Sequence, residues 1–463
     1  MWSVRLTLAI LPERDLYLSF KKAYWFTFAV AVAVLLAVVW RGPVPVPDIY
    51  AARPGQPLAG LTPHERDLFE RGRALFAHEF SVDEGLGPLF NARSCQECHA
   101  GGAGSALEGK DVTASGDVYI GTIDPRSPRA RDPETAREED DIYDFSSLSG
   151  KGGPVLQRRS ITSEFSSLFP PQCSLEAGGV PAEARFVCVR HAPPLLGMGL
   201  IDAIDEQTIL ANMIRQAKDA PDLVGRTNPV ADPLTARTRV GRFGWKDQQA
   251  NLLLFTAQSL NTELGVTTYI QSTSCSGRAG QVFPSCILPR LPPEPNDEGD
   301  KMLLLNAYLT LLAPPRTPHL PAGGGKGTEL FKRLRCAVCH TPELETAPVV
   351  EMADPDSPLP KIRYIEVKAL EGRPVKLYSD LLLHAMGPDL ADGIVQGTAR
   401  GGEWRTAPLW GLGRKKFFLH DGRARTIDAA ILAHHGQSEP VTRSYMQLPG
   451  RDRAALLEFL GSL

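Results

Sequence analysis

Cysteine, charge of one sign and long apolar runs are all scarce in this chain of 463 residues. Eight cysteines are too few for the disulfide-dense scaffold of a small secreted domain. The 50 basic and 53 acidic side chains leave a net charge of −3 and no basic stripe. Because a nucleic-acid backbone is bound by clustered positive charge, this balance argues against nucleic acid as a partner.

The one long apolar run is residues 23–40, eighteen residues without a charged side chain. That length just spans the hydrocarbon core of a membrane as a helix. Basic residues precede it, which predicts a cytoplasmic tail at residues 1–22 and export of the chain beyond residue 40. A cleaved signal peptide is the alternative, but the leader is long and no small-x-small site precedes "RGPVPVP". We therefore expect a single-pass bacterial inner-membrane protein with its body in the periplasm, beyond a Pro-rich linker at residues 41–60.

Four of the eight cysteines stand in two pentads of the pattern Cys-x-x-Cys-His. The residues are Cys95, Cys98, His99, Cys336, Cys339 and His340. In a c-type haem site the two sulfurs form thioethers with the porphyrin vinyl groups, and the adjacent imidazole binds the iron. Zinc is the alternative, but zinc modules seldom place His directly after the second Cys. The sequence therefore predicts two covalently bound haem c groups, with His99 and His340 as iron ligands.

The other four cysteines are Cys173, Cys188, Cys275 and Cys286. An even remainder in an exported protein predicts disulfides. Sequential pairing, Cys173 with Cys188 and Cys275 with Cys286, closes two short loops, and the other two pairings stay open.

The second haem motif lies in a repeat of the first. Helical apolar spacing precedes both motifs, and "RHAPPLLGMGL" from residue 190 matches "RTAPLWGLG" from residue 405. With short gaps allowed, the match continues so that Ile201 stands opposite His420. We expect a mainly α fold with two cytochrome c-like haem domains, residues 61–320 with a loop-rich insertion and residues 321–463.

The stretches "FGWKDQQANLLLFTAQSLNTELG", "YSDLLLHAMGPDLADG" and "FLHDGRARTIDAAILAHHG" add a family resemblance. Over residues 60–463 the chain resembles the di-haem oxidoreductases sometimes labelled thiol oxidoreductases. It is similar, more distantly, to bacterial di-haem cytochrome c peroxidases and to the di-haem enzyme that matures a tryptophylquinone cofactor. The resemblance implies a small peroxide-like substrate and an electron donor that is a protein or is linked to quinone. Calcium stays open as an additional ion.

In the resembled peroxidases, a residue about fourteen positions after the "HDG" histidine is the distal ligand of the second haem. Here the count from His420 reaches His434. Helical spacing after a cap at Thr426 points His434 inward and His435 away. A histidine that only packs in the core is the alternative to this ligand role, and Met386 is the alternative ligand.

The first half shows no His or Met where His434 would be matched, so we expect its iron to lack a strong sixth ligand. The resemblance implies that this haem meets peroxide, with Glu206 and Gln207 as candidate acid and base. The alternative for these two is an ordinary helix start. Other candidate sixth ligands are His191, Met198 and Met213.

The sequence thus predicts a membrane-anchored, peroxidase-like oxidoreductase in which the His99 haem reacts and the His340 haem relays electrons. The alternative is an electron-transfer cytochrome with both irons six-coordinate and no chemistry of its own.

Overall fold

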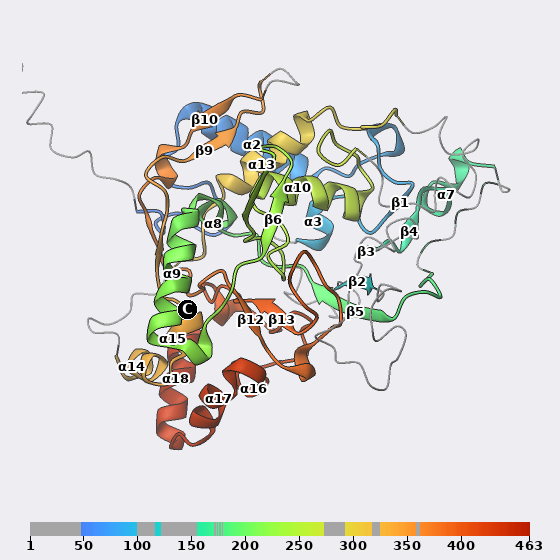
Figure 1. Cartoon of the computed structure of the whole chain (residues 1–463). Helices are drawn as coiled ribbons and strands as arrows, with labels where there is room; N and C mark the ends of the chain where they lie inside the picture. The colour runs from blue at the N-terminus through green and yellow to red at the C-terminus, as the bar shows by residue number, and fades with distance from the viewer. Residues whose placement is uncertain are drawn as a thin grey trace, which may run out of the picture. The chain divides into compact units, whose positions relative to one another are not determined.

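Two crossed pairs of helices, one in each half of the chain, support the two Cys-x-x-Cys-His motifs (Figure 1). In the first half α2 (Pro63–Ala77) crosses α13 (Asp300–Thr310), and the motif follows as α3 (Cys95–Cys98). In the second half α14 (Gly325–Arg333) crosses α18 (Gly450–Ser462), and the motif follows as α15 (Cys336–Cys339). The arrangement agrees with two copies of one haem-binding unit.

The structure is a computed structural model, and it describes residues 48–99, 116–121, 155–170, 173, 175, 177, 179–272, 292–316, 325–357 and 362–463. All of these belong to one unit, Asp48–Leu463. The other α-helices are α7 (Ile161–Glu164), α8 (Met198–Ala203), α9 (Glu206–Asp219), α10 (Leu252–Ser259), α16 (Ile427–Leu432) and α17 (Glu439–Met446). A π-helix, η7 (Leu260–Leu264), directly continues α10. Short 3₁₀ helices are η1 (Val82–Glu84), η4 (Ser166–Leu168), η6 (Pro221–Leu223), η8 (Lys368–Leu370), η9 (Pro388–Leu390), η10 (Leu412–Arg414) and η11 (Gly436–Ser438).

Local sequence explains where α2 begins. Thr62 accepts a hydrogen bond from the backbone N–H of Glu65 at 3.2 Å, and the Glu65 carboxylate accepts one from the N–H of Thr62 at 2.6 Å. This reciprocal capping box, followed by Pro63, satisfies N–H groups that a helix start would otherwise leave unpaired. The apolar face then buries Phe69 and Phe76 against Tyr308 of α13, with ring centres about 5 Å apart.

Each helix crossing contains one glycine at the point of closest approach. A Cβ on Gly72 would lie 2.6 Å from both the Leu304 carbonyl oxygen and the Tyr308 Cβ. A Cβ on Gly327 would lie 2.4 Å from the carbonyl oxygen of Ala455. Since no real Cβ contact is this short, only glycine permits either pair of helices to approach so closely.

We expect Gly72→Ala and Gly327→Ala each to lower the free energy of unfolding by about 1–3 kcal/mol, because the added methyl group overpacks a tight helix contact. Gly450→Ala, where a Cβ meets nothing within 4 Å, is the matched control and should change it by less than about 0.5 kcal/mol. Denaturant unfolding of the haem-loaded chain measures all three. Equal effects at the three positions would contradict the packing argument.

The described residues also form six small antiparallel sheets. The largest has the strand order β3-β2-β5, with β3 Val155–Leu156, β2 Gly116–Gly121 and β5 Phe186–His191. The others pair β1 (Leu89–Phe90) with β4 (Arg159–Ser160), β6 (Pro229–Asp232) with β7 (Arg237–Val240), β9 (Glu351–Ala353) with β10 (Tyr364–Glu366), β8 (Leu344–Glu345) with β11 (Pro374–Val375), and β12 (Leu383–Ala385) with β13 (Glu403–Arg405). The predicted mainly α class is therefore wrong, and the fold mixes helices with strands. Strands of two to six residues are too short to show alternation in the sequence.

A second repeated unit, a hairpin-like turn followed by a capped helix, fixes the register of the two halves. Phe243 is bridged to Gln249, with Asn251 capping α10, while Phe418 is bridged to Ala424, with Thr426 capping α16. This unit places Trp245, rather than the predicted Ile201, opposite His420. The sequence match fails at this point because the first half contains α9, β6 and β7 between the Gly-x-Gly segment and the capped helix.

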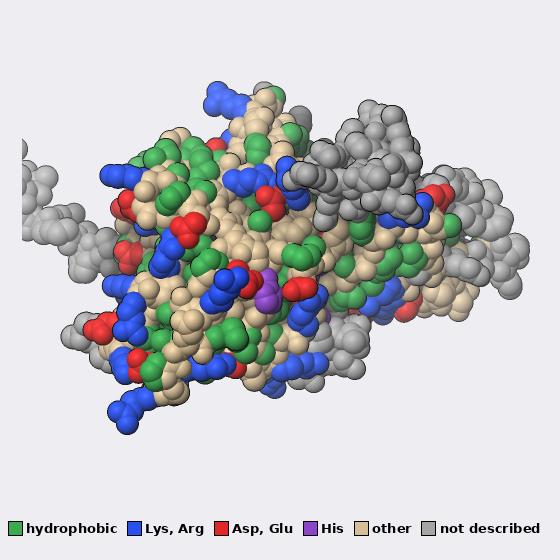
Figure 2. All heavy atoms as spheres, turned by 60° about the horizontal axis from the view of Figure 1, so that its bottom comes forward, with side chains coloured by type: hydrophobic (Ala, Val, Ile, Leu, Met, Phe, Trp, Pro, Cys, Tyr) green, Lys and Arg blue, Asp and Glu red, His purple; other side chains and the backbone are tan. Residues whose placement is uncertain are grey.

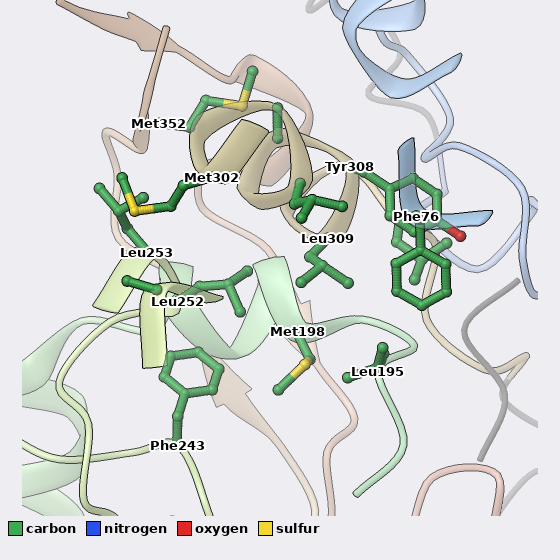
Figure 3. Packing of buried hydrophobic residues seen from close by; sticks show 14 of the residues in the cluster. Phe76, Leu195, Met198, Phe243, Leu252, Leu253, Met302, Tyr308, Leu309 and Met352 are labelled. Atoms are coloured by element: carbon green, nitrogen blue, oxygen red, sulfur yellow. The ribbon is translucent and has the colours of Figure 1, made fainter. Parts of the chain in front are cut away.

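The larger hydrophobic core surrounds α2, α8, α10 and α13, and Figure 3 shows part of it. Met198 lies in this core with Leu195 and Leu309. Residues from the second half, including Val375 and Leu382, belong to the same cluster, whereas a smaller one includes Phe331 and Phe459. The larger cluster therefore extends across residue 320. The predicted domain limits, residues 61–320 and 321–463, stay a prediction.

No helix among the described residues is both long and apolar enough to span a membrane. A span needs about 20 mostly apolar residues, whereas α2 has 15 residues and several charged side chains. The predicted span, residues 23–40, lies outside the described residues. The absence of a spanning helix among the described residues contradicts the prediction of a single-pass inner-membrane protein with a periplasmic body.

Candidate functional site

His340 and His434 face each other in the second half of the chain. Their ring centres are 6.5 Å apart, with an angle of 49° between the ring planes. Two imidazoles that bind one metal ion from opposite sides, at bond lengths of about 2 Å, have ring centres roughly 6–6.5 Å apart. The observed separation therefore fits a single iron between these two rings.

The hydrogen bonds of both rings leave the same nitrogen for a metal. His340 Nδ1 donates to the Tyr378 carbonyl oxygen at 3.0 Å, and His434 Nδ1 donates to the Ala430 carbonyl oxygen at 2.7 Å. These bonds fix the tautomer so that each Nε2 carries a lone pair. Burial lowers the pKa of His340 to about 4 and also lowers that of His434. Both rings are therefore neutral near pH 7, which is the form that binds iron.

His99 adjoins a pocket in the first half of the chain. The pocket contains about 1100 Å³ of empty space, part of it open to solvent, and is lined by both cysteines of the motif. Burial lowers the pKa of His99 to about 4, and no described residue bonds to its buried Nδ1. Apolar walls from Phe76, Leu305 and Leu309 suit a large flat ring. The residues here fit a haem.

The first site differs from the second at the position facing the proximal histidine. Eight residues after the helix caps at Asn251 and Thr426 stand Ser259 and His434, respectively. Ser259 lines the His99 pocket, and its hydroxyl donates to the Phe255 carbonyl oxygen at 2.9 Å. Serine is a poor iron ligand, and this hydroxyl already has a partner. The chain thus supplies a histidine across from His340 and only a serine at the matching position of the first site.

Glu263 is a carboxylate in the lining of the His99 pocket, and it lies near the end of the stretch "FGWKDQQANLLLFTAQSLNTELG". It lies on the π-helix η7, a kind of local widening that often marks functional sites. Asn91 Nδ2 donates to one Glu263 oxygen at 3.0 Å. The Thr262 hydroxyl lies 3.1 Å from the other oxygen and shares its single proton with the Gln258 carbonyl oxygen at 3.0 Å. The Asn91 bond therefore orients the carboxylate at the pocket wall. Gln258 also lines the pocket.

Glu206 and Gln207, the predicted acid and base, do not line this pocket. Glu206 begins α9 and accepts hydrogen bonds from Arg239 Nε at 2.8 Å and from the Val240 N–H at 3.1 Å. Gln207 is exposed. The structure therefore places both residues at a helix start, which was the alternative interpretation of this segment.

The other candidate iron ligands lie in different surroundings. Among the first-half candidates, His191 lines the His99 pocket, and the described residues leave its buried Nδ1 without a partner. Met198 is a core residue, and Met213 packs against that core. In the second half, Met386 accepts a long contact of 4.0 Å from the Ser438 hydroxyl. His435 is partly exposed and contacts the Glu439 carboxylate at 3.2 Å.

A buried charged and aromatic cluster connects the two halves. Arg190 Nε donates to Asp392 at 2.7 Å, and Lys246 Nζ lies 3.9 Å from the centre of the Trp404 ring. His420 stacks on Trp404 with ring centres 3.7 Å apart. Burial, only partly offset by Asp392, lowers the pKa of Lys246 to about 7. The motifs "FGWKD" and "HDG" point to this region, but the sequence does not show that their charges share one cluster.

Each of these two motifs also accepts one backbone hydrogen bond from the other half of the chain. The His191 N–H donates to the His420 carbonyl oxygen at 2.8 Å, and the Arg405 N–H donates to the Trp245 carbonyl oxygen at 3.0 Å. The two bonds are equivalent under the repeat, because Gly197 and Gly411, which come six residues after each donor, both cap short helices with positive φ. Each half therefore helps to position the other.

One predicted disulfide is wrong. Cys188 has a free thiol, which donates to Asp392 at 3.3 Å. Cys173 is disulfide-bonded, so its partner cannot be Cys188. Cys275 and Cys286, the other predicted pair, lie outside the described residues.

Comparison with known proteins identifies the family. Residues 182–463, more than half of the chain, match the family described as "Di-haem oxidoreductase, putative peroxidase". A solved structure of hydrazine synthase from Kuenenia stuttgartiensis, pressurised with xenon, is 12% identical, covers 63% of this chain and 99% of its own, and has a TM-score of 0.24. That score is too low to carry an argument. No curated protein matches the chain. The family match includes residues 336–340 and most of the His99 pocket, and on this basis the chain belongs to the di-haem oxidoreductase family.

Proposed function

We propose that the chain is a peroxidase-like enzyme with two covalently attached haems, the first reactive and the second relaying electrons. Membership in a family of haem oxidoreductases supports the general reaction. The single observation that carries the division of labour is the difference between His434, which faces His340, and Ser259 at the matching position of the His99 pocket. An iron held by two imidazoles suits electron transfer, whereas an iron with one open position can take a substrate.

Bound haem would supply the redox chemistry at both sites. The chain supplies neutral imidazoles at His99, His340 and His434 and apolar walls around the first haem. Glu263 is the acid/base we propose for proton transfer to peroxide, because it lines the pocket and the Asn91 side-chain amide holds its carboxylate. Glu206 is less well placed, since it begins α9 and does not line this pocket.

Aromatic side chains offer a route for electrons between the sites. Trp245 lines the His99 pocket, and its ring centre is 6.5 Å from that of Trp404. Trp404 is the cross-strand partner of His384, which contacts the attachment residue Cys339 at 3.5 Å. We propose that electrons pass along these residues from the second haem to the first.

The electron donor we propose is a protein or a quinone-linked donor, and the substrate a small peroxide. On the face drawn in Figure 2, acidic and basic side chains are interspersed with apolar ones. A donor that docks on this face would therefore need mixed complementarity rather than a strong charge of one sign.

Mass spectrometry tests the covalent attachment. The denatured chain should gain the mass of two haems, and the tryptic peptides that contain Cys95 and Cys336 should each retain one haem after acid–acetone extraction. One addition, or none, would overturn the proposal that both motifs bind haem c.

Carbon monoxide separates the enzyme from a plain electron-transfer cytochrome. If only the first iron has an open position, the reduced chain should bind carbon monoxide at one haem, and peroxide should be turned over with an artificial donor. Two low-spin haems in both oxidation states, with no carbon monoxide complex, would favour the electron carrier instead.

His434→Gly should convert one low-spin haem to high-spin, because it removes the imidazole that faces His340. His435→Gly is the matched control: this neighbour contacts Glu439 and is partly exposed, so its loss should leave the absorption and electron paramagnetic resonance spectra nearly unchanged. The reverse pattern would assign the ligand role to His435.

A further inference from the structure

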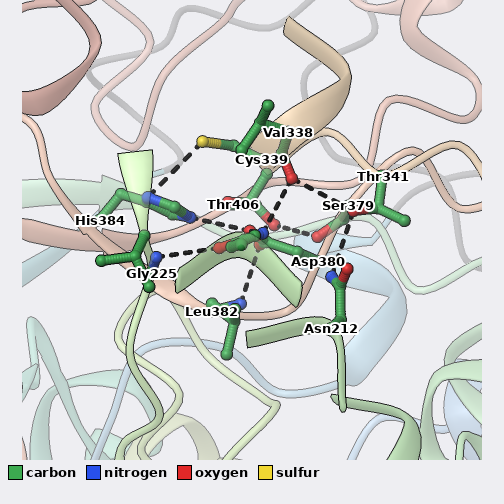
Figure 4. Close-up of polar contacts among 12 residues, drawn as sticks. Asn212, Gly225, Val338, Cys339, Thr341, Ser379, Asp380, Leu382, His384 and Thr406 are labelled. Atoms are coloured by element: carbon green, nitrogen blue, oxygen red, sulfur yellow. Dashed lines mark hydrogen bonds and ion pairs between the residues drawn. The ribbon is translucent and has the colours of Figure 1, made fainter. Parts of the chain in front are cut away.

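An imidazole beside the second haem motif contacts both a carboxylate and a sulfur (Figure 4). His384 Nε2 lies 2.8 Å from Asp380 Oδ2, and His384 Nδ1 lies 3.5 Å from Cys339 Sγ. That sulfur belongs to a free thiol here and represents the thioether sulfur of the attached haem. We propose that His384, as a permanent cation hydrogen-bonded to this sulfur, makes the second haem easier to reduce. The inference rests on the haem attachment and the electron relay proposed above.

Asp380 supplies the negative charge that stabilises this cation. Its carboxylate is fully buried, and it accepts hydrogen bonds from His384 Nε2, from Gln216 Nε2 at 2.8 Å and from the Leu382 N–H at 3.0 Å. A carboxylate that only accepts hydrogen bonds is in its ionised form. Gln216 also donates to the Val338 carbonyl oxygen at 2.8 Å, which ties Asp380 to α15.

The two neighbours of the imidazole place a proton on each ring nitrogen. Asp380 can only accept, so His384 Nε2 carries one proton. A thioether sulfur has no proton to donate, so Nδ1 carries the second proton once haem is attached to Cys339. Burial opposes the positive charge that results, but Asp380 and Cys339 raise the pKa of His384 well above its usual value, and Asp380 contributes most to the rise. His384 is therefore an imidazolium near pH 7.

Packing holds the ring beside the sulfur. His384 lies on β12 and is only 4% exposed, so water screens its charge little. A Cβ on Gly225 would lie 2.7 Å from His384 Nε2, so any larger residue would push the ring aside. The Gly225 N–H donates to Gln216 Oε1 at 2.9 Å, which joins this loop to the side chain that binds Asp380.

The charge of His384 determines the sign of its effect on the haem. Reduction by one electron removes one positive charge from the haem iron, so a nearby cation favours the reduced form and a nearby anion opposes it. An Asp380 oxygen, a His384 nitrogen and Cys339 Sγ all lie within 4.8 Å of one another, so the carboxylate alone would oppose reduction. The imidazolium offsets that carboxylate and also bonds to the sulfur. Hydrogen bonding near a haem is one of the ways in which a protein sets its reduction potential.

The step that this residue assists is a one-electron transfer. The donor, proposed above as a protein or a quinone-linked donor, loses one electron, and that electron reduces the second haem. No bond forms or breaks and no proton moves, because His384 keeps both of its ring protons throughout. A second haem that is more readily reduced takes electrons more completely from a given donor.

Reduction potentials test the proposal in the full-length, haem-loaded chain. A redox titration followed by absorption reports the low-spin second haem and the first haem separately. His384→Gln removes the charge and should lower the equilibrium constant for reduction of the second haem roughly tenfold, which corresponds to about 59 mV for one electron. The first haem is the internal control, because His384 does not line the His99 pocket, and its equilibrium constant should change less than about twofold.

His384→Lys separates a role of the charge from a role of the ring in packing. Neither lysine nor glutamine reproduces the shape of the imidazole, but lysine restores a cation beside Asp380. The equilibrium constant of the Lys variant should therefore stay within about threefold of the parent value. Equal losses in the Gln and Lys variants would mean that the shape of the ring matters and not its charge, which would overturn the proposal. An unchanged potential in His384→Gln would overturn it too.

Gly225→Ala keeps the imidazole and tests its position, and it decides the matter if His384→Gln leaves Asp380 unpaired and the chain does not load haem. The added methyl group pushes the ring away from the sulfur or from the carboxylate, and either movement weakens the effect of the cation. We expect reduction of the second haem to become less favourable. An unchanged potential in Gly225→Ala would contradict the proposal.

His78→Gln is the matched control for the loss of a histidine–carboxylate pair. His78 Nε2 also lies 2.8 Å from a carboxylate oxygen, that of Glu84, but its side chain is 43% exposed. Water and salt screen such a pair, so both reduction potentials should stay at their parent values. An equal shift in His78→Gln and His384→Gln would show that the contact with the Cys339 sulfur is not the cause. A parent chain without haem at the second motif would refute the proposed function instead.

Discussion

Glu263→Gln is expected to slow peroxide cleavage by roughly 10²-fold while leaving peroxide binding nearly unchanged. The amide keeps the size of the side chain and can keep a bond to Asn91 or Thr262, but it cannot take up and release a proton. The loss should therefore appear in the cleavage step and not in the affinity. Stopped-flow absorption of the first haem measures peroxide binding and peroxide cleavage as separate steps.

Glu206→Gln is the matched control, because it makes the same chemical change outside the His99 pocket. It weakens the ion pair with Arg239, whose side chain is 39% exposed, and should alter peroxide cleavage less than about twofold. Glu206 was the candidate acid that the family resemblance suggested, so the pair of variants decides between the two carboxylates. Slow cleavage in Glu206→Gln with normal cleavage in Glu263→Gln would show that the pocket does not identify the catalytic group.

The sequence predicts those parts of the sites whose groups are close in the chain. Each Cys-x-x-Cys-His motif contains its two sulfurs and its imidazole within five residues, so no tertiary knowledge is needed to find it. His434 came from the family resemblance, as the residue fourteen positions after His420, and helical spacing from the cap at Thr426 agreed with it. In the structure α16 ends at Leu432, two residues before His434. The family resemblance, confirmed over residues 182–463, adds the expectation of a haem oxidoreductase.

The register between the halves depends on contacts that the sequence does not show. The match of Gly197 with Gly411 is correct, but the residues after them take different paths, since only the first half inserts a long helix and a hairpin. The bonds from His191 to His420 and from Arg405 to Trp245 join residues more than 150 positions apart. Glu263 lies within the stretch "FGWKDQQANLLLFTAQSLNTELG", but the sequence does not show that this part of the chain lines the His99 pocket.

Ser259→His should fill the open coordination position of the first haem iron. The substitution places an imidazole eight residues after the cap at Asn251, the same position that His434 occupies after Thr426. An imidazole held beside the iron acts at a high effective concentration, so peroxide turnover and carbon monoxide binding should fall by roughly 10²-fold or more. The high-spin signal of the first haem should become low-spin.

Ser259→Ala controls for loss of the hydroxyl, which bonds only to the Phe255 carbonyl oxygen among the described residues, and it should keep the open site and its activity.

The double variant Ser259→His with His434→Gly is the most decisive test of the two haem roles. If the residue facing the proximal histidine decides which haem reacts, this variant should bind carbon monoxide at the second haem and no longer at the first. Retention of carbon monoxide at the first haem in Ser259→His would mean that position 259 does not face the iron, and the assignment of the two roles would lose its basis.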